Sequence, residues 1–168
     1  MATTYEAIAT VTVGSGGAAN IEFTSIPGTY TDLLLKISAR TTATNGSYIT
    51  MGFNGSTSSF SNKTLYGSGG SVGSFTVPAR FGGYINNSGT TANTFSNTEI
   101  YIPNYTSANN KSFSDDGASE TNGTAAELSL SAGLWSNTSA ITSIELGVGD
   151  AGNFAQYSTA TLYGIKNS

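Results

Sequence analysis

The acidic residues of this chain cluster at one place, Asp115-Asp116-Gly117, with Glu120 three residues further on. Carboxylate oxygens gathered in a loop are ligands that Ca²⁺ prefers, although this stretch lacks the alternating ligands of an EF-hand loop. The alternative interpretation is a solvated loop that carries acids because they are soluble. A glycosidase would need two carboxylates about 5 to 10 Å apart, and no pair stands out among the ten acids. We therefore predict no metal ligand and no catalytic residue.

Histidine and cysteine do not occur in the sequence. This excludes disulfides, thiolate nucleophiles, histidine general bases and the usual zinc ligand sets. The glycine-rich stretches 14–17 and 67–70 have the composition of phosphate loops, but such a loop needs a helix N-terminus directly after its glycines. Neither stretch opens a helical pattern. The sequence thus predicts that the protein is not an enzyme and holds no cofactor.

Four aromatic residues in polar surroundings are candidates for a carbohydrate-binding face. If Phe60, Tyr66, Tyr84 and Tyr105 are exposed, their rings could stack on sugar faces. The alternative is that they are core or interface residues, since Phe and Tyr are enriched in buried contacts. Both interpretations remain open from the sequence.

The composition limits the number of domains and the kinds of partner that the protein can have. The chain has 168 residues and a net charge of −4, and only 10% of its residues are charged, against about 25% in average proteins. This length suits one domain, which we take as 1–168, with a core of its own. The six cations are scattered, which argues against nucleic acid as a partner. No signal peptide and no membrane span is apparent, so we expect synthesis in the cytoplasm.

The C-terminal part of the chain shows the clearest alternation of apolar and polar residues. In 143–148 and in 160–165 every second residue faces one side, as a half-buried sheet requires. Leu128 and Leu130 precede them and are expected on an apolar face, with Trp135, the single tryptophan, beneath the sheet. This block predicts strand, turn, strand, turn, strand.

The rest of the chain continues this pattern, with the turn signals Asn45-Gly46 and Asn54-Gly55 on either side of one strand. The stretches 56–73 and 105–124 are rich in Ser, Gly and Asn and are expected to be long loops, with 111–113 as a candidate short strand in the second. No window has helical periodicity over three turns. The sequence predicts an all-β fold, a single antiparallel β-sandwich of eight or nine short strands with essentially no helix, in which a jelly roll is favoured over an immunoglobulin-like sandwich. The expected strands are 5–13, 20–26, 32–40, 48–53, 75–85 (two short strands or one bent strand), 98–102, 128–135, 143–148 and 160–165.

The C-terminal block also carries a resemblance. Trp135, the strand around Ala140-Ile141-Thr142, the loop with Gly152 and Phe154, and the closing strand 158–165 are similar to the C-terminal part of small jelly-roll structural proteins of tailed bacteriophages. The stretch 21–40 is similar to the opening of such proteins. The resemblance covers roughly half of the chain and implies no catalytic residue.

The resemblance implies a virion structural protein. The first hypothesis is a capsid decoration (cement) protein that binds the major capsid protein and itself, as a homotrimer. The second is the tip of a tail or head fibre that binds host surface glycans; a polysaccharide-degrading enzyme is a distant third. The β pattern begins at Tyr5 with no preceding shaft, which favours the decoration protein.

Overall fold

In the computed structural model, which describes residues 4–45, 47–77, 80–123 and 126–166, the chain is all-β and these residues contain no helix. They form twelve strands rather than the eight or nine expected. No helix in this part of the chain is long and apolar enough to cross a membrane. The strands are β1 (Tyr5–Thr12), β2 (Asn20–Phe23), β3 (Asp32–Ala39), β4 (Ser47–Phe53), β5 (Phe60–Ser68), β6 (Ser71–Val77), β7 (Phe81–Ile85), β8 (Ser96–Ile102), β9 (Lys111–Ser119), β10 (Glu127–Trp135), β11 (Ile144–Val148) and β12 (Thr159–Ile165).

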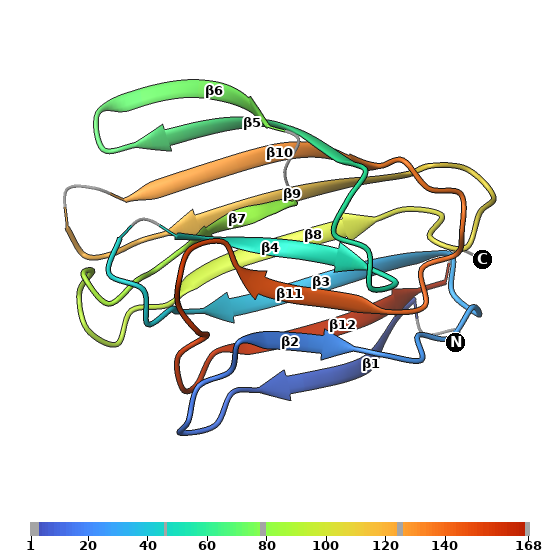
Figure 1. The fold of residues 1–168 in the computed structure, drawn as a ribbon, viewed down its shortest axis with the longest axis horizontal. Coiled ribbons are helices and arrows are strands. Elements are labelled where there is room, and N and C mark those ends of the chain that lie inside the picture. Colours follow the sequence, from blue (N-terminus) through green and yellow to red (C-terminus); the bar gives the residue numbers. More distant parts are fainter. Residues whose placement is uncertain (1–3, 46, 78–79, 124–125, 167–168) are drawn as a thin grey trace.

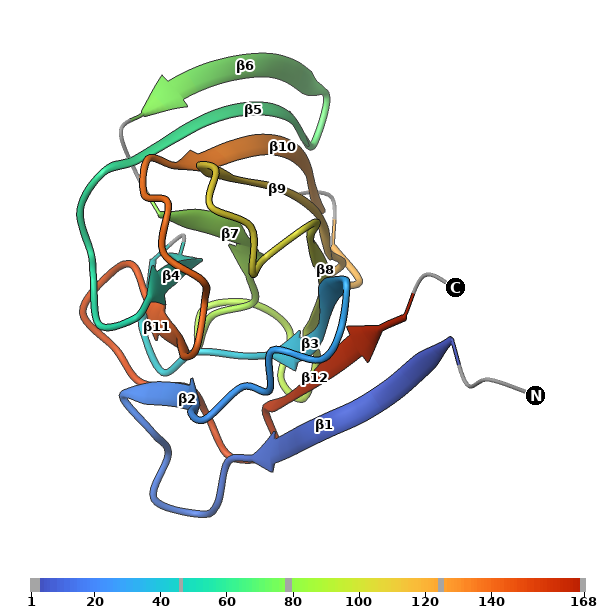
Figure 2. The same ribbon diagram turned by 90° about the vertical axis from the view of Figure 1, so that its right-hand side faces the viewer.

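The strands form two antiparallel sheets that pack as a sandwich (Figure 1). The large sheet has eight strands in the order β1-β12-β3-β8-β9-β10-β5-β6, and the small sheet has four in the order β2-β11-β4-β7. In the view of Figure 2 the large sheet curves around the small one, and β5 and β6 extend beyond β7. The predicted β-sandwich is confirmed.

The core lies between the two sheets and is built from the alternating strands that the sequence marks most clearly. Leu33, Leu35 and Ile37 of β3 point inward, and so do Ile100 and Ile102 of β8. Each buried Leu or Ile side chain contributes about 1.5 to 3 kcal/mol. These central strands therefore supply much of the apolar core.

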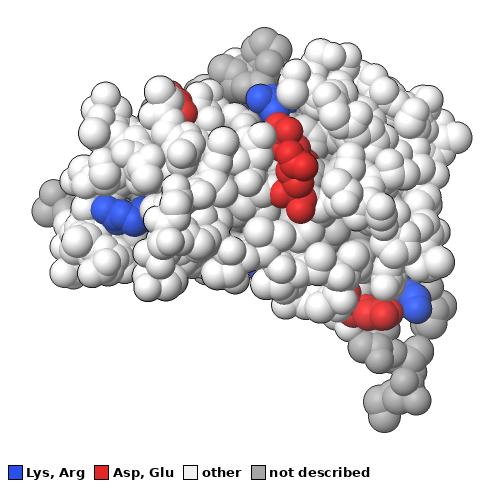
Figure 3. Space-filling model, turned by 60° about the horizontal axis from the view of Figure 1, so that its bottom comes forward, with Lys and Arg blue, Asp and Glu red and all other residues white. Residues whose placement is uncertain are grey.

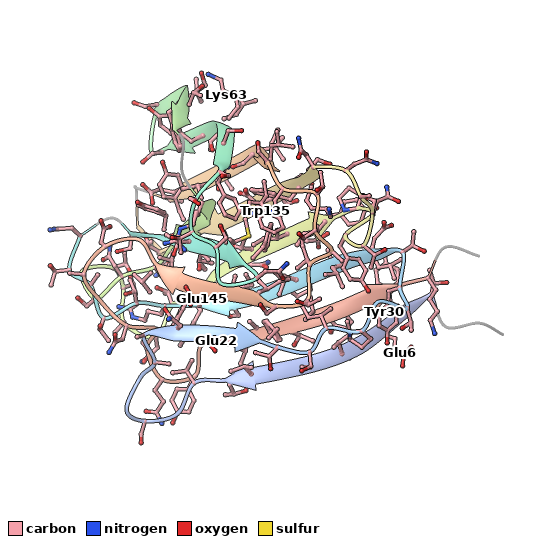
Figure 4. The ribbon with its side chains drawn as sticks, turned by 45° about the vertical axis from the view of Figure 1, so that its right-hand side comes forward. Glu6, Glu22, Tyr30, Lys63, Trp135 and Glu145 are labelled. Carbon is pink, nitrogen blue, oxygen red and sulfur yellow. The ribbon has the colours of Figure 1, made fainter. Side chains whose placement is uncertain are left out.

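Trp135 lies beneath the large sheet, as expected, in a cluster of aromatic rings (Figure 4). Its ring centroid is 5.5 Å from that of Phe53 and 6.1 Å from that of Phe60. Phe113 meets the ring of Phe53 edge-on at 6.0 Å. Edge-to-face pairs of this kind add about 0.5–1.5 kcal/mol each beyond their burial. The cluster joins β4, β5, β9 and β10.

The prediction of two long loops is wrong. The stretch 56–73 contains β5 and the start of β6, which pair as a hairpin from Ser68↔Ser71 onward, and Gly69 in its turn has φ +54°. The stretch 105–124 contains β9, which is nine residues long. The region 75–85, left open between two strands and one bent strand, forms two strands that lie in different sheets, β6 and β7.

The Asn54-Gly55 turn is confirmed. Both residues have positive φ, +53° and +72°, and Phe53 and Ser56 on either side exchange two backbone hydrogen bonds. Asparagine and glycine adopt this conformation at low cost, which is why the pair favours tight turns. The other predicted turn, Asn45-Gly46, includes Gly46, which lies outside the described residues.

Candidate functional site: an apolar face on the large sheet

Four large apolar side chains gather on the outer face of the large sheet. Leu65 of β5, Val72 of β6, and Leu128 and Leu130 of β10 are 57%, 89%, 61% and 56% exposed. Leu65 lies directly opposite Leu130, and Gly67 lies between Leu128 and Val72 in the neighbouring strands. Because cross-strand partners are about 5 Å apart, the four side chains form one surface, called here the apolar face.

The apolar face borders a shallow depression of about 810 Å³. Its lining includes the four apolar side chains together with the small residues Gly67, Gly117 and Ala118. Asp116 and Asn97 line the side toward β8. Contiguous apolar surface of this kind is uncommon on a soluble monomer and marks interaction sites.

The sequence groups Leu128 and Leu130 with Trp135 in one block that has a single apolar face, and the structure separates them. Trp135 is buried, and a strand turns every second side chain to the same face, so Ser129 and Ser131 point inward with it. Leu128 and Leu130 therefore point to solvent. The single tryptophan, rather than the two leucines, sets which face of β10 is buried.

Behind the apolar face the interior of the sandwich is polar. Asp115 of β9 accepts a hydrogen bond from Ser131 Oγ at 3.0 Å, and Ser131 Oγ lies 3.0 Å from Thr64 Oγ1. Thr64 in turn donates to Asn62 Oδ1. All four side chains are buried. The large sheet is thus inverted here, with hydroxyls and a carboxyl inside and leucines outside.

The carboxyl of Asp115 is the most perturbed acid of the described residues. The residue is 1% exposed, and this burial raises the pKa of its carboxyl to about 7, against the hydrogen bond from Ser131, which lowers it. The charge of Asp116 raises the pKa further. The Asp115 Oδ2 atom has no hydrogen-bond partner among the described residues. At neutral pH a large fraction of this carboxyl is therefore protonated.

The acidic residues that could have formed a Ca²⁺ loop do not converge. They lie on or just after a strand, so Asp115 points inward and Asp116 points outward. Glu120 follows the end of β9 and accepts a hydrogen bond from the backbone of Asn122. Among the residues that the structure describes there is no group of three potential metal ligands.

The four candidate aromatics do not form an exposed sugar-binding face. Phe60 and Tyr105 are buried in the core, and the Tyr105 hydroxyl donates to the carbonyl of Pro27. Tyr66 and Tyr84 are half-buried and pack against other rings, at 5.8 Å from Phe75 and 5.3 Å from Phe81 respectively. Their core role, one of the two interpretations of the sequence, is the one the structure favours.

Charged side chains are sparse on the surface, as the composition predicts. The face in Figure 3 is mostly uncharged, with acidic and basic residues in a few separate places. Glu22 of β2 and Glu145 of β11 lie directly opposite each other on neighbouring strands (Figure 4). Surface of this kind depends on shape and apolar contact for recognition more than on charge.

Comparison with known proteins gives no relative: no protein-family model, no curated protein and no solved structure matches the chain. The function must therefore be argued from the geometry.

Proposed function

We propose that this protein is a non-catalytic structural module that docks on another protein through the apolar face. The exposure of Leu65, Val72, Leu128 and Leu130 in one contiguous patch is the observation that carries the proposal. Burial of apolar surface contributes about 25 cal/mol per Å² before the cost of association. The sparse charge elsewhere leaves this patch as the main source of binding energy that the described surface offers.

We also infer that eight of the strands form a jelly roll. β4 pairs with β7, β3 with β8, β2 with β11 and β1 with β12, so the pairs nest like one long hairpin folded over itself. This nesting supports a jelly roll, a double-sheet fold that recurs in viral capsid proteins. On this interpretation β5-β6 and β9-β10 are two added hairpins, and they are the strands that carry the apolar face and the polar interior behind it.

The resemblance to phage proteins gives the proposal its setting. In that setting the protein is a virion component, a capsid decoration protein that stabilises the head by contacts with the major capsid protein and with its own copies. The alternative, a tail or head fibre tip that binds host surface glycans, loses support because Phe60 and Tyr105 are buried. A decoration protein would be present in about as many copies as the shell subunits, and a fibre tip in far fewer.

A charge on the apolar face is expected to abolish docking without unfolding the chain. Leu128→Glu places a carboxylate in the patch, where desolvation would cost several kcal/mol on binding. We expect the copy number on purified particles, measured by quantitative mass spectrometry, to fall more than tenfold. Particles that lack the protein should release their genome at a lower temperature.

The matched control is Ser38→Glu. Ser38 is exposed on β3 and lies outside the apolar face. Successive cross-strand pairs through β8 and β9 connect it to Leu128, so the two residues lie at the same level of the sheet. This variant should bind particles like the wild type. Equal incorporation of the Leu128→Glu protein would refute docking through the apolar face, and a loss of adsorption to cells with an intact shell would favour the fibre tip.

A further inference from the structure

The two sheets have four edge strands, and one of them differs from the others. β1 and β6 are the edges of the large sheet, and β2 and β7 those of the small sheet. An edge strand presents unpaired N–H and C=O groups that can pair with another chain, and proteins usually protect such edges with charges, bulges or short strands. Comparison of the four edges shows which one is open to a partner.

The β1 edge is protected by an irregularity and by charge. Its register with β12 shifts between Ala7 and Ala9, which marks a bulge. Glu6 on this strand forms an ion pair of 3.6 Å with Lys166. A second strand laid along β1 would meet both a break in the ladder and a carboxylate.

The two edges of the small sheet are short and irregular. β2 has four residues and carries the exposed Glu22. β7 has five residues, and its register with β4 shifts between Tyr48 and Thr50. Arg80 directly before β7 donates to the Met51 carbonyl at 3.2 Å. Neither edge offers a long regular row of backbone groups.

The β6 edge has none of these protections. It is seven residues long, its sequence SVGSFTV contains no charge and no proline, and it pairs with β5 without a break from Ser71 to Val77. The two-residue turn makes Ser68 and Ser71 a hydrogen-bonded pair, so the N–H and C=O groups of Val72, Ser74 and Thr76 point away from β5. These three residues form a regular, uncharged edge.

We propose that two copies of this chain pair through β6, antiparallel and about a two-fold axis at Ser74. In this arrangement Ser74 lies opposite Ser74 of the second copy, and Val72 lies opposite Thr76. Each outward N–H of one copy then meets a C=O of the other. A two-fold interface uses the same residues on both sides, and a strand without charges can face its own copy without repulsion.

The side chains on both faces of β6 suit this pairing. On the outer face the opposed residues are Val72 and Thr76, two β-branched residues that pack well across strands. On the inner face Phe75 would lie opposite Gly73 of the second copy, over which the Tyr66 ring of that copy packs, so that two aromatic rings would meet there. A second copy is thus a better occupant of the edge than a charged partner strand.

Pairing through β6 would join the two apolar faces. The two-fold axis is perpendicular to the plane of the sheet, so the outer faces of both copies lie on the same side of one continuous sheet. Val72 on β6 and Leu65 on the neighbouring β5 would then be the apolar side chains nearest to the second copy. The paired molecule presents twice the apolar surface of one copy, and this consequence rests on the docking function proposed above.

The experiment compares Ser74→Pro with Ser74→Ala by analytical ultracentrifugation over a range of concentrations. Proline removes one outward N–H and places its ring where the second strand must lie, but it leaves the hydrogen bonds to β5 intact. We expect the wild type and Ser74→Ala to have twice the mass of the chain. Ser74→Pro should raise the dissociation constant of the pair about a hundredfold or more. The fluorescence of Trp135 and the far-ultraviolet circular dichroism should stay unchanged.

Crosslinking provides a test that does not depend on proline. The sequence contains no cysteine, so Ser74→Cys introduces a single thiol that faces its copy across the axis at a Cα separation of about 5.5 Å, within disulfide range. Oxidation should give a covalent dimer, whereas Thr10→Cys on the β1 edge should not. The proposal would be overturned if the wild type had the mass of one chain or of three chains. It would also be overturned if the Ser74→Pro protein still paired, or if both cysteine variants crosslinked equally. A three-chain mass would favour the homotrimer that the resemblance implies, and Leu128→Glu should leave the pair intact.

Discussion

Replacing Asp115 by asparagine is expected to remove most of the pH dependence of stability between pH 4 and pH 7. Burial raises the pKa of the Asp115 carboxyl from 3.8 to about 7 in the folded protein. As the pH rises through this range, the unfolded chain releases the proton while the folded chain keeps it. The free energy of unfolding therefore falls with pH. The stabilisation is complete below about pH 4 and is lost by about pH 7.

The size of this effect follows from the shift. Three pKa units correspond to about 4 kcal/mol, a large part of the 5–15 kcal/mol that stabilises a typical domain. Asparagine keeps an oxygen that can accept the hydrogen bond from Ser131 and never ionises. At pH 8 the Asp115→Asn protein should thus be the more stable one, by up to about 4 kcal/mol in urea unfolding.

The control for this experiment is Asp116→Asn. Asp116 is the next residue of β9 but is exposed on the opposite face, so this variant should keep the fall in stability with pH. Glu127 has a pKa that burial also raises, so a shallow slope should remain in Asp115→Asn. A wild-type free energy of unfolding that is constant from pH 5 to pH 8 would show that Asp115 is ionised or solvated in the folded protein.

The second large effect is expected from Gly133→Ala. Gly133 lies directly opposite Phe113 in the β9-β10 pair, and a Cβ atom at Gly133 would overlap the Phe113 ring. The ring cannot move away, because it is buried and packs edge-on against Phe53 and Phe60. Overpacking of this kind costs about 1–3 kcal/mol or more. The melting temperature should fall by about 5–10 °C in calorimetry.

A double variant separates this steric explanation from a general effect of alanine. Phe113→Leu with Gly133→Ala should cost less than the two single changes added together, because the smaller side chain makes room for the new methyl group. Gly16→Ala, where a Cβ atom has no neighbour within 4 Å, should leave the melting temperature nearly unchanged. If Gly133→Ala were equally harmless, the ring of Phe113 would not lie over Gly133.

The sequence predicts the strands whose inward residues are apolar. β3 alternates Leu or Ile with polar residues, β8 does so over its second half, and β12 alternates small or apolar residues with Thr and Tyr; the burial of each follows that alternation. The missed strands bury polar side chains. Asn62 and Thr64 point inward from β5, and Lys111 and Asp115 point inward from β9. A period of two in hydrophobicity is not visible where the buried face carries hydroxyls, amides and charges.

The orientation of β10 shows a second limit of the sequence. Leu128 and Leu130 have the stronger apolar signal, but Trp135 has the opposite parity and packs in the aromatic cluster. Which face is buried is decided by contacts with β4 and β5, far apart in the sequence. The presence of two leucines and a tryptophan on opposite faces of one strand is the signal that would have revealed an exposed apolar face.

Thiol labelling at the apolar face tests the account most directly. In Leu128→Cys the only thiol of the chain should react with a maleimide reagent in the isolated protein about as fast as an unstructured thiol, whereas Ser129→Cys, on the buried side of β10, should react far more slowly. If the protein is the virion component proposed above, the Leu128→Cys thiol in purified particles should become protected by about tenfold or more. A Leu128→Cys thiol that reacts slowly in the isolated chain would contradict the inverted strand, and one that stays equally reactive in the particle would contradict docking through the apolar face.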